Sequence, residues 1–180
     1  MNAPLQAAET PTDLPGDSIY LLDLGLVDQD SRASKLSDLR GRPVLIAMFY
    51  TSCKYACPLV IDTLKSTAKA LPDDARARLR IVLVSFDPQR DTPAVLKAVS
   101  AERHIDLAHW TLARTDEAGV RELAAVLDVH YRAVMNGDFN HSSTITLLDE
   151  QGRIAAHSDR LGEPDPDLVA SVRRIIAAAP

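Results

Sequence analysis

The sequence predicts an α/β domain in which a mixed sheet carries helices on both sides. Apolar runs at 44–49 and 80–86 are typical of buried strands. Between these runs, apolar residues recur at the spacing of a helix. A strand–helix–strand unit of this length is typical of parallel strands joined by a right-handed crossover. Residues 143–148 and 153–157 alternate around a turn at 149–152, which indicates an antiparallel hairpin. The sheet is therefore expected to contain both strand orientations.

Length and composition favour one soluble globular domain. The 180 residues suffice for one domain with a full core but not for two comfortable ones. A net charge of −5 argues against nucleic acid or an anionic membrane as the main partner, and 4% aromatic residues argue against a base-stacking surface. We expect a flexible tail at 1–17 and a single domain at 18–180. Residues 1–15 lack the charged start and apolar run of a signal peptide, and the apolar run at 19–22 is too short to span a bilayer.

The N-terminal half of the domain is expected to begin with a small hairpin. Residues 19–24 and 26–35 would pair through a turn at 28–31, followed by a short helical turn at 36–41. After the first buried strand, apolar residues at helical spacing predict a helix that starts at Pro58 and ends near 71–74; these residues are Val60, Ile61, Leu64, Ala68 and Leu71.

The second half repeats one helix-start pattern. Thr92 and Asp165 are each followed by proline, so each is expected to cap a helix whose first residue is that proline. The first of these helices would run to about Arg103. Between them we expect a strand at 110–113, an amphipathic helix around 120–127, and a strand at 131–135 before a turn at 136–138.

Both cysteines of the chain lie on the predicted strand-to-helix turn. Cys53 and Cys57 have three residues between them, and Pro58 follows at the expected first position of the helix. Cys57 would then be the N-cap residue, close to unpaired N–H groups and the positive end of the helix dipole. These groups, with Lys54 nearby, are expected to lower the thiol pKa below its free value of about 8.5. The turn is therefore predicted to support sulfur chemistry, although two inert buried thiols are the plain alternative.

The histidines decide what two thiolates could do. Two thiolates alone form a disulfide pair or an incomplete metal site, and thioredoxin-type enzymes usually have two residues between their cysteines rather than three. Two thiolates and one imidazole suit copper, whereas zinc would want a fourth ligand. His141 is the preferred third ligand because it precedes the hairpin strand, whose entry loop could reach the cysteine turn. The other histidines have structural explanations at the ends of helices and strands: His104, His109, His130 and His157.

Three separated motifs resemble those of the Sco (SenC) family of copper chaperones. The first is Tyr-Thr-Ser-Cys-Lys-Tyr-Ala-Cys-Pro at 50–58, and the second is the Asp-Pro-x-x-Asp-x-Pro loop within 84–93. The third is Asn-His-Ser-Ser at 140–143 with the strand and turn that follow it. The resemblance extends from about residue 19 to the end of the chain.

The resemblance implies a thioredoxin-like fold that binds one copper ion through Cys53, Cys57 and His141. It implies delivery of copper, or of reducing equivalents, to the copper A site of cytochrome c oxidase subunit II or a related copper enzyme. An upstream copper donor or a thiol reductant would be further partners. The protein would then work in the periplasm, free or membrane-anchored. Asp87 is the candidate for a group that supports the metal ligands, and Asp91 is expected to be structural.

Two departures from the family pattern affect these expectations. Asn140 stands where Asp often precedes the histidine, which removes a negative charge beside the metal. Lys54, Tyr55 and Ala56 replace the commoner Pro-Asp-Val between the cysteines. We therefore keep three hypotheses: a metallochaperone rather than an enzyme; a thiol-disulfide oxidoreductase that reduces cysteines of a copper-accepting protein; and a copper or redox sensor. Met135 is expected to pack as a core residue.

Overall fold

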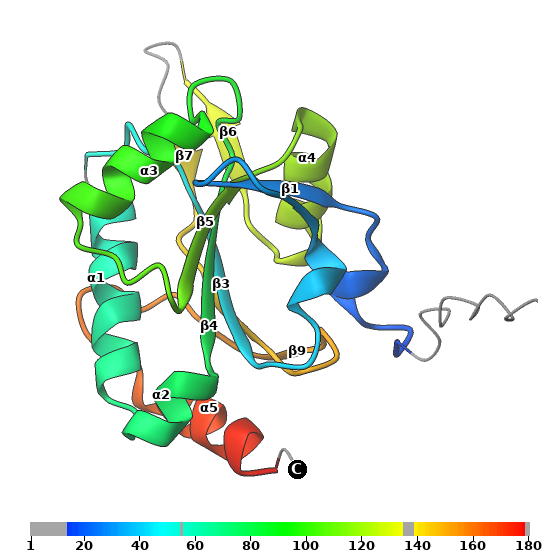
Figure 1. The fold of residues 1–180 in the computed structure, drawn as a ribbon, viewed down its shortest axis with the longest axis vertical. Helices are drawn as coiled ribbons and strands as arrows, with labels where there is room; N and C mark the ends of the chain where they lie inside the picture. Colours follow the sequence, from blue (N-terminus) through cyan, green and yellow to red (C-terminus); the bar gives the residue numbers. More distant parts are fainter. Residues whose placement is uncertain (1–13, 55, 135–138, 179–180) are drawn as a thin grey trace, which may run out of the picture.

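A central sheet organises the molecule. The computed structural model describes residues 14–54, 56–134 and 139–178. Within this part of the chain, the sheet has seven strands in the order β2-β1-β5-β4-β3-β8-β9, and β6 and β7 form a separate two-stranded sheet (Figure 1). The strands are β1 (Gly25–Asp28), β2 (Ala33–Lys35), β3 (Val44–Phe49), β4 (Arg80–Ser85), β5 (Trp110–Arg114), β6 (Tyr131–Ala133), β7 (Phe139–His141), β8 (Ile145–Leu148) and β9 (Ile154–Ser158).

The sheet is mixed, as predicted. Strand β3 runs parallel to β4, and β4 runs parallel to β5. Strand β8 is antiparallel to β3, β9 is antiparallel to β8, and β1 is antiparallel to β5. The register places Phe49, the last residue of β3, beside Ser85, the last residue of β4. The loops that follow these two parallel strands therefore leave the same end of the sheet.

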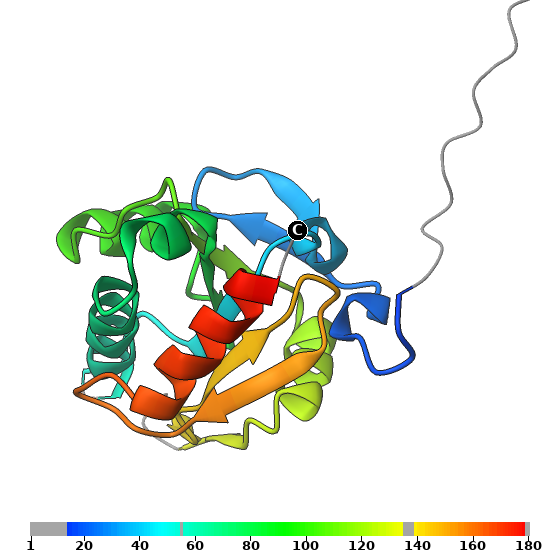
Figure 2. The same ribbon diagram turned by 90° about the horizontal axis from the view of Figure 1, so that it is seen from below.

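Helices cover both faces of the sheet, which confirms the layered arrangement (Figures 1 and 2). Helices α1, α3 and α5 lie on one face, and α4 lies on the other. The elements are η1 (Ile19–Leu21), η2 (Leu36–Leu39), α1 (Ala56–Lys69), α2 (Asp73–Arg78), α3 (Pro93–Glu102), α4 (Glu117–Val126) and α5 (Pro166–Ala178). None of the helices in the described residues is long and apolar enough to cross a bilayer.

The helix starts predicted at Pro93 and Pro166 are confirmed, whereas α1 begins at Ala56 and not at the predicted Pro58. The Thr92 hydroxyl accepts a hydrogen bond from the Val95 N–H at 3.4 Å, and α3 begins at Pro93. Asp165 accepts from the Asp167 N–H at 3.0 Å at the start of α5. The first N–H groups of a helix have no acceptor inside it. Because these two side chains accept hydrogen bonds from them, each helix begins at the capped position.

The N-terminal hairpin forms, but residues 19–24 are not one of its strands. Strands β1 and β2 pair across the predicted turn, where the Asp28 carboxylate accepts from the Asp30 and Arg32 N–H groups at 2.8 and 2.9 Å. Residues 19–21 instead form the short 3₁₀ helix η1, in which Ser18 accepts from the Tyr20 N–H. The Tyr20 ring fills the space above Gly152, where a Cβ would lie 2.5 Å from the ring. Packing of the ring in the core therefore overrides the extended preference of this apolar run.

Other departures are local. Helix α2 was not predicted, because its six residues are too few to show a period. Strand β6 covers residues 131–133 of the predicted strand 131–135, whereas Met135 and the turn 136–138 lie outside the described residues. Most of the expected tail at 1–17 lies outside them too.

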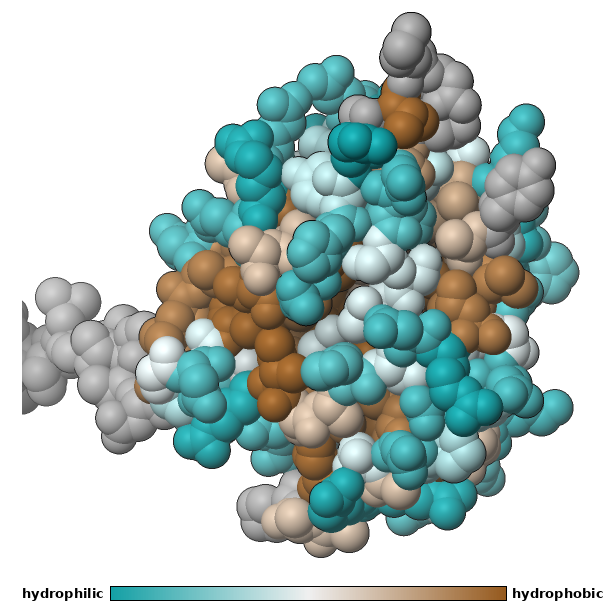
Figure 3. All heavy atoms as spheres, turned by 180° about the vertical axis from the view of Figure 1, so that it is seen from behind, coloured by the Kyte–Doolittle hydropathy of each residue, from teal (hydrophilic) through white to brown (hydrophobic). Residues whose placement is uncertain are grey.

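One face combines hydrophilic residues with a hydrophobic patch, which lies toward the left of the view (Figure 3). Leu21 and Ile154 are exposed large hydrophobic residues. A hydrogen bond from the Ile19 N–H to the Gly152 carbonyl at 3.0 Å joins η1 to the turn that precedes β9. The N-terminal segment is thus attached to the β8–β9 turn.

Candidate metal centre

The fold brings the three predicted ligand residues together. One potential ligand atom from each of Cys53, Cys57 and His141 lies within 4.8 Å of the other two. Cys57 is buried, and the other two residues are half-buried. Among the described residues this is the one cluster of at least three histidine, cysteine or acidic side chains with such spacing. Two thiols and an imidazole therefore form a compact donor set at the carboxyl end of β3.

Short backbone contacts hold the two sulfurs. The Cys57 sulfur accepts a hydrogen bond from the Tyr50 N–H at 3.4 Å, and the Cys53 sulfur accepts one from the Cys57 N–H at the same distance. Both cysteines are in the thiol form, without a disulfide between them. Helix α1 begins at Ala56, so Cys57 lies inside its first turn and is not the predicted N-cap. The sulfur of Cys53 takes over part of the capping, because it accepts from an N–H of this first turn.

The predicted lowering of the Cys57 pKa is wrong. Burial raises the pKa of the Cys57 thiol far above its ordinary value, and the hydrogen bond from the Tyr50 N–H offsets only part of this effect. The neighbouring Cys53 and the charge of Asp91 raise this pKa further. Lys54, which was expected to favour the thiolate, is exposed. Loss of hydration at a sulfur with 3% exposure thus outweighs the helix dipole.

His141 reaches the cysteines from a strand rather than from a loop. It is the last residue of β7, where it pairs with Tyr131 of β6, and the Ser142 N–H donates to the His130 carbonyl at 2.9 Å. The His141 Nδ1 lies 2.9 Å from the Ser142 carbonyl oxygen. A carbonyl only accepts, so Nδ1 carries the hydrogen and the Nε2 lone pair is available for a metal. The backbone therefore selects the tautomer that a ligand histidine needs.

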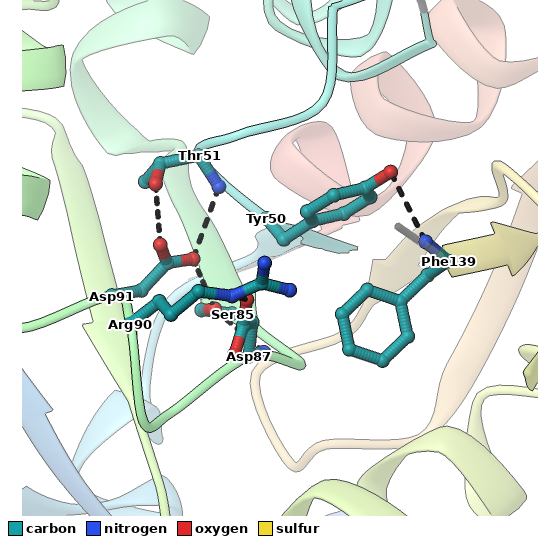
Figure 4. A network of polar contacts seen from close by, with 7 residues as sticks. All are labelled: Tyr50, Thr51, Ser85, Asp87, Arg90, Asp91 and Phe139. Carbon is teal, nitrogen blue, oxygen red and sulfur yellow. Dashed lines mark hydrogen bonds and ion pairs between the residues drawn. The ribbon is translucent and has the colours of Figure 1, made fainter. Parts of the chain in front are cut away.

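An aromatic cluster surrounds the imidazole. The rings of Tyr50 and Phe86 lie at centroid distances of 5.8 and 4.9 Å from the His141 ring. Phe139 contacts both of these rings at 5.1 and 5.2 Å, and its N–H donates to the Tyr50 hydroxyl at 3.3 Å (Figure 4). Phe86 also stacks on Tyr131 at 5.6 Å. These contacts attach the small β6–β7 sheet to the end of the main sheet and fix the position of the histidine.

Asp91 supports the cysteine loop, in keeping with the structural role expected for it, although the sequence did not reveal its partners. Its carboxylate is 1% exposed and accepts hydrogen bonds from the Thr51 N–H at 3.0 Å, from the Thr51 hydroxyl and from the Ser85 hydroxyl (Figure 4). Asp87, the residue predicted to support the ligands, forms an ion pair with Arg90. The turn-forming Asp91 therefore anchors Thr51 in the loop between β3 and Cys53.

Two cavities flank the ligand cluster. One of about 60 Å³ borders both sulfurs and is also lined by Pro58, Val99 and Arg103. The other, about 290 Å³, is lined by three aromatic residues and three charged ones: Phe86, Tyr131, Phe139, Asp87, Glu117 and Arg121. The second cavity is an aromatic groove that includes Phe86, the ring that contacts His141.

The remaining histidines lie apart from this centre. The His104 Nδ1 lies near the Ala101 carbonyl oxygen, and the His109 Nδ1 lies near the Arg80 guanidinium. The His130 side chain is exposed. His157 belongs to β9, two strands away from β3 in the sheet. None of them joins a metal-binding cluster within the described part of the chain.

Comparison with known proteins places the chain in a family. The SCO1/SenC family model matches residues 17–177. A Stutzerimonas stutzeri protein is 35% identical over 138 residues, which cover 74% of this chain and 66% of that protein. An SCO2-like protein of Rickettsia prowazekii is 30% identical, with 73% and 65% covered. The chain thus spans about two thirds of the length of these relatives.

The fold agrees with the sequence relationship. The structure of Bradyrhizobium japonicum ScoI with copper bound superposes with a TM-score of 0.70 at 26% identity, covering 84% of this chain and 96% of that one. This similarity confirms the thioredoxin-like fold that the motifs implied. With the family model spanning nearly the whole chain, the protein belongs to the SCO1/SenC family.

Proposed function

We propose that this protein is a copper metallochaperone that carries one copper ion on Cys53, Cys57 and His141. The observation that carries the proposal is the clustering of the three ligand atoms within 4.8 Å of one another. Three ligands around an ion with bonds of about 2.2 Å stand roughly 3.8 Å apart, so closure needs only a small movement. Thiolates select Cu(I), and imidazole accepts both oxidation states. The bound copper ion would be the cargo that the protein transfers.

Relatives support copper as the metal. Residues 17–177 match the SCO1/SenC family, and the related ScoI structure contains copper. The raised pKa of the Cys57 thiol adds a condition, because a thiol must lose its proton to bind a metal. Copper loading would therefore release protons.

The acceptor is proposed to be the copper A site of cytochrome c oxidase subunit II or of a related copper enzyme. Cys53 and His141 are half-buried, whereas Cys57 is buried. An acceptor ligand would therefore replace the accessible donors first, and Cys57 would release the ion last. The groove beside Phe86 offers aromatic rings close to His141 for contact with the acceptor. Asp87, which lines this groove, is proposed to act on the site or on the acceptor from there.

The working place is proposed to be the periplasm, with the protein free or membrane-anchored. This proposal rests on family membership and on the acceptor, whose copper site would be loaded on that side. Fractionation of cells that produce the full natural protein would test it, and recovery in the cytoplasm would contradict it.

A thiol-disulfide oxidoreductase is the second candidate. The two cysteine sulfurs lie within 4.8 Å of each other, so a disulfide needs only a local rearrangement. In this function the pair would reduce the cysteines of a copper-accepting protein and become a disulfide, with two electrons and two protons passing to the acceptor. His141 would then have no essential part.

One comparison separates these functions. His141→Ala should reduce copper affinity at least tenfold while leaving dithiol exchange with a model disulfide within about twofold of the wild type. His130→Ala is the matched control, because His130 is exposed and belongs to the same region of the chain. Copper affinity that survives His141→Ala, together with lost exchange activity, would contradict the chaperone proposal.

A further inference from the structure

A third cavity lies at the opposite end of the sheet from the cysteines. Its volume is about 580 Å³, within the range of small-molecule sites. Ile81 and Trp110, which are paired at the start of β4 and β5, belong to its lining. Ile81 is level with Leu45, four residues before the end of β3, so about 13 Å of strand separates this level from the cysteine end. The cavity is therefore distinct from the metal centre.

Positive charge is concentrated around this cavity. Lys65 and Lys69 come from successive turns of α1, and Arg76 comes from α2, which lies at the foot of β4 (Figure 1). Among the lining residues, only Asp106 carries a carboxylate. The protein as a whole has a net charge of −5. A local excess of positive charge in an acidic protein favours an anionic ligand.

Several of these cations are not neutralised by acidic partners. The Lys69 side chain has no hydrogen-bond or ion-pair partner within residues 14–54, 56–134 and 139–178. Lys65 donates to the Arg103 carbonyl, which carries no charge. Arg76 pairs with Asp73, whose side chain is 92% exposed, and such surface pairs are weak and screened. All three side chains therefore keep positive charge available to a ligand.

His109 adds a donor of defined orientation. Its Nδ1 lies 2.9 Å from the Arg80 guanidinium, which can only donate, so Nδ1 is the acceptor. The neutral ring then carries its hydrogen on Nε2, which can donate to an anion. The helix dipole could explain Lys69 in the last turn of α1, but it does not explain Arg76 and His109, which come from other segments. A metal is not favoured, because His104, Asp106 and His109 do not form a metal-binding cluster.

We propose that this cavity binds a small organic anion with at least two negative charges, either a phosphate ester or a polycarboxylate. Lys65, Lys69, Arg76 and the His109 Nε2–H would hold the anionic groups. Leu79 and Trp110 form apolar lining against which the rest of the ligand would pack. The proposal is independent of the copper function, because neither its residues nor its ligand involve the metal centre.

Trp110 provides a specific readout, because it is the only tryptophan of the chain. The copper-free full chain would be titrated with pyrophosphate and with citrate at constant ionic strength, by tryptophan fluorescence and by calorimetry. We expect saturable one-site binding that changes the Trp110 emission. Stronger binding of pyrophosphate would assign the phosphate class, and stronger binding of citrate the polycarboxylate class.

Two variants decide the outcome. Lys69→Gln should weaken binding at least tenfold, and it should fold normally because Lys69 is exposed. Lys35→Gln removes the same charge from the exposed strand β2 and should change affinity less than twofold. Retention of copper binding by Lys69→Gln would show that the rest of the molecule is intact. Equal loss in both variants, no saturation, or binding without a change in Trp110 emission would each overturn the proposal.

Discussion

The buried carboxylate of Asp91 binds Thr51, which lies in the loop between β3 and Cys53. The Thr51 N–H donates to this carboxylate at 3.0 Å, and the Thr51 hydroxyl donates to its second oxygen. Two loops that are 40 residues apart in the sequence are thereby joined at the carboxyl ends of β3 and β4. The geometry of the cysteine loop thus depends on a side chain that is not itself a proposed ligand.

Asp91→Ala is expected to weaken both the fold and copper retention. The change leaves the Thr51 N–H, the Thr51 hydroxyl and the Ser85 hydroxyl without their acceptor, which should cost about 2 kcal/mol of unfolding free energy. Urea unfolding measures this loss, and competition with a Cu(I) chelator measures affinity.

Two further variants make this test specific. Asp91→Asn keeps one acceptor oxygen and should lie between Asp91→Ala and the wild type in both measurements. Asp87→Ala breaks the ion pair with Arg90 but leaves the Thr51 contact, so it should retain more stability than Asp91→Ala. Equal stability and copper affinity in Asp91→Ala and the wild type would show that the Thr51 contact has no supporting role.

The two thiols are expected to react at different rates in the copper-free protein. Cys53 is half-buried, whereas Cys57 is 3% exposed, and burial raises the pKa of Cys57. At pH 7.5 the Cys57 sulfur is therefore a protonated thiol, and only the thiolate attacks alkylating reagents. Mass spectrometry after brief treatment with iodoacetamide should find the label on Cys53 first.

The pH dependence of labelling has a definite sign. A raised pKa means that Cys57 becomes reactive only as the pH rises well above 8.5, so its rate should still be increasing at pH 9.5. The Cys53→Ser variant isolates this measurement. Faster labelling of Cys57 than of Cys53 at pH 7.5 would contradict the burial argument.

Tyr20→Phe is expected to stabilise the protein. The Tyr20 hydroxyl is buried and has no hydrogen-bond partner among the described residues. Removing it should raise the unfolding free energy by roughly 1 kcal/mol, because a buried unpaired hydroxyl loses its hydration without compensation. Urea unfolding of the two proteins at pH 7.5 measures the difference. A lower unfolding free energy in Tyr20→Phe would contradict the prediction and show that the hydroxyl has a hydrogen-bond partner.

The same substitution should remove one source of alkaline sensitivity. Burial, with a smaller effect of the Asp149 charge, raises the pKa of Tyr20. Because the tyrosine pKa is higher in the folded protein than in the unfolded chain, folding is favoured fully at pH values below the unfolded pKa of about 10. This stability is lost as the pH rises from there toward the folded-state pKa. Between pH 9 and 11 the wild type should therefore lose more stability than Tyr20→Phe. The Cys57 thiol, which is present in both proteins, cancels in this comparison.

Local chemistry in the sequence predicts much of the fold. Proline after Thr92 and after Asp165 predicts two helix starts, because capping is decided within a few residues. The buried strands β3 and β4 are long enough to show their apolar pattern. The cysteine pair is identified in the same way, from its position between β3 and α1.

What the sequence did not predict depends on contacts between distant segments. Strand β7 is three residues long and pairs only with β6, so it shows no alternation of its own. The rise in the Cys57 pKa follows from tertiary burial, which the helix-start pattern does not contain. The contact between Asp91 and Thr51 likewise requires that β3 and β4 be adjacent and in register.

Copper stoichiometry combined with visible absorption tests the central claim most directly. The reduced protein would be titrated with Cu(I) and Cu(II) beside Cys57→Ser and His141→Ala. The three-ligand account predicts one tightly held copper per chain and a thiolate-to-Cu(II) charge-transfer band that both variants lose. No retained copper, with a reversible disulfide between Cys53 and Cys57 instead, would contradict it and favour the thiol reductase.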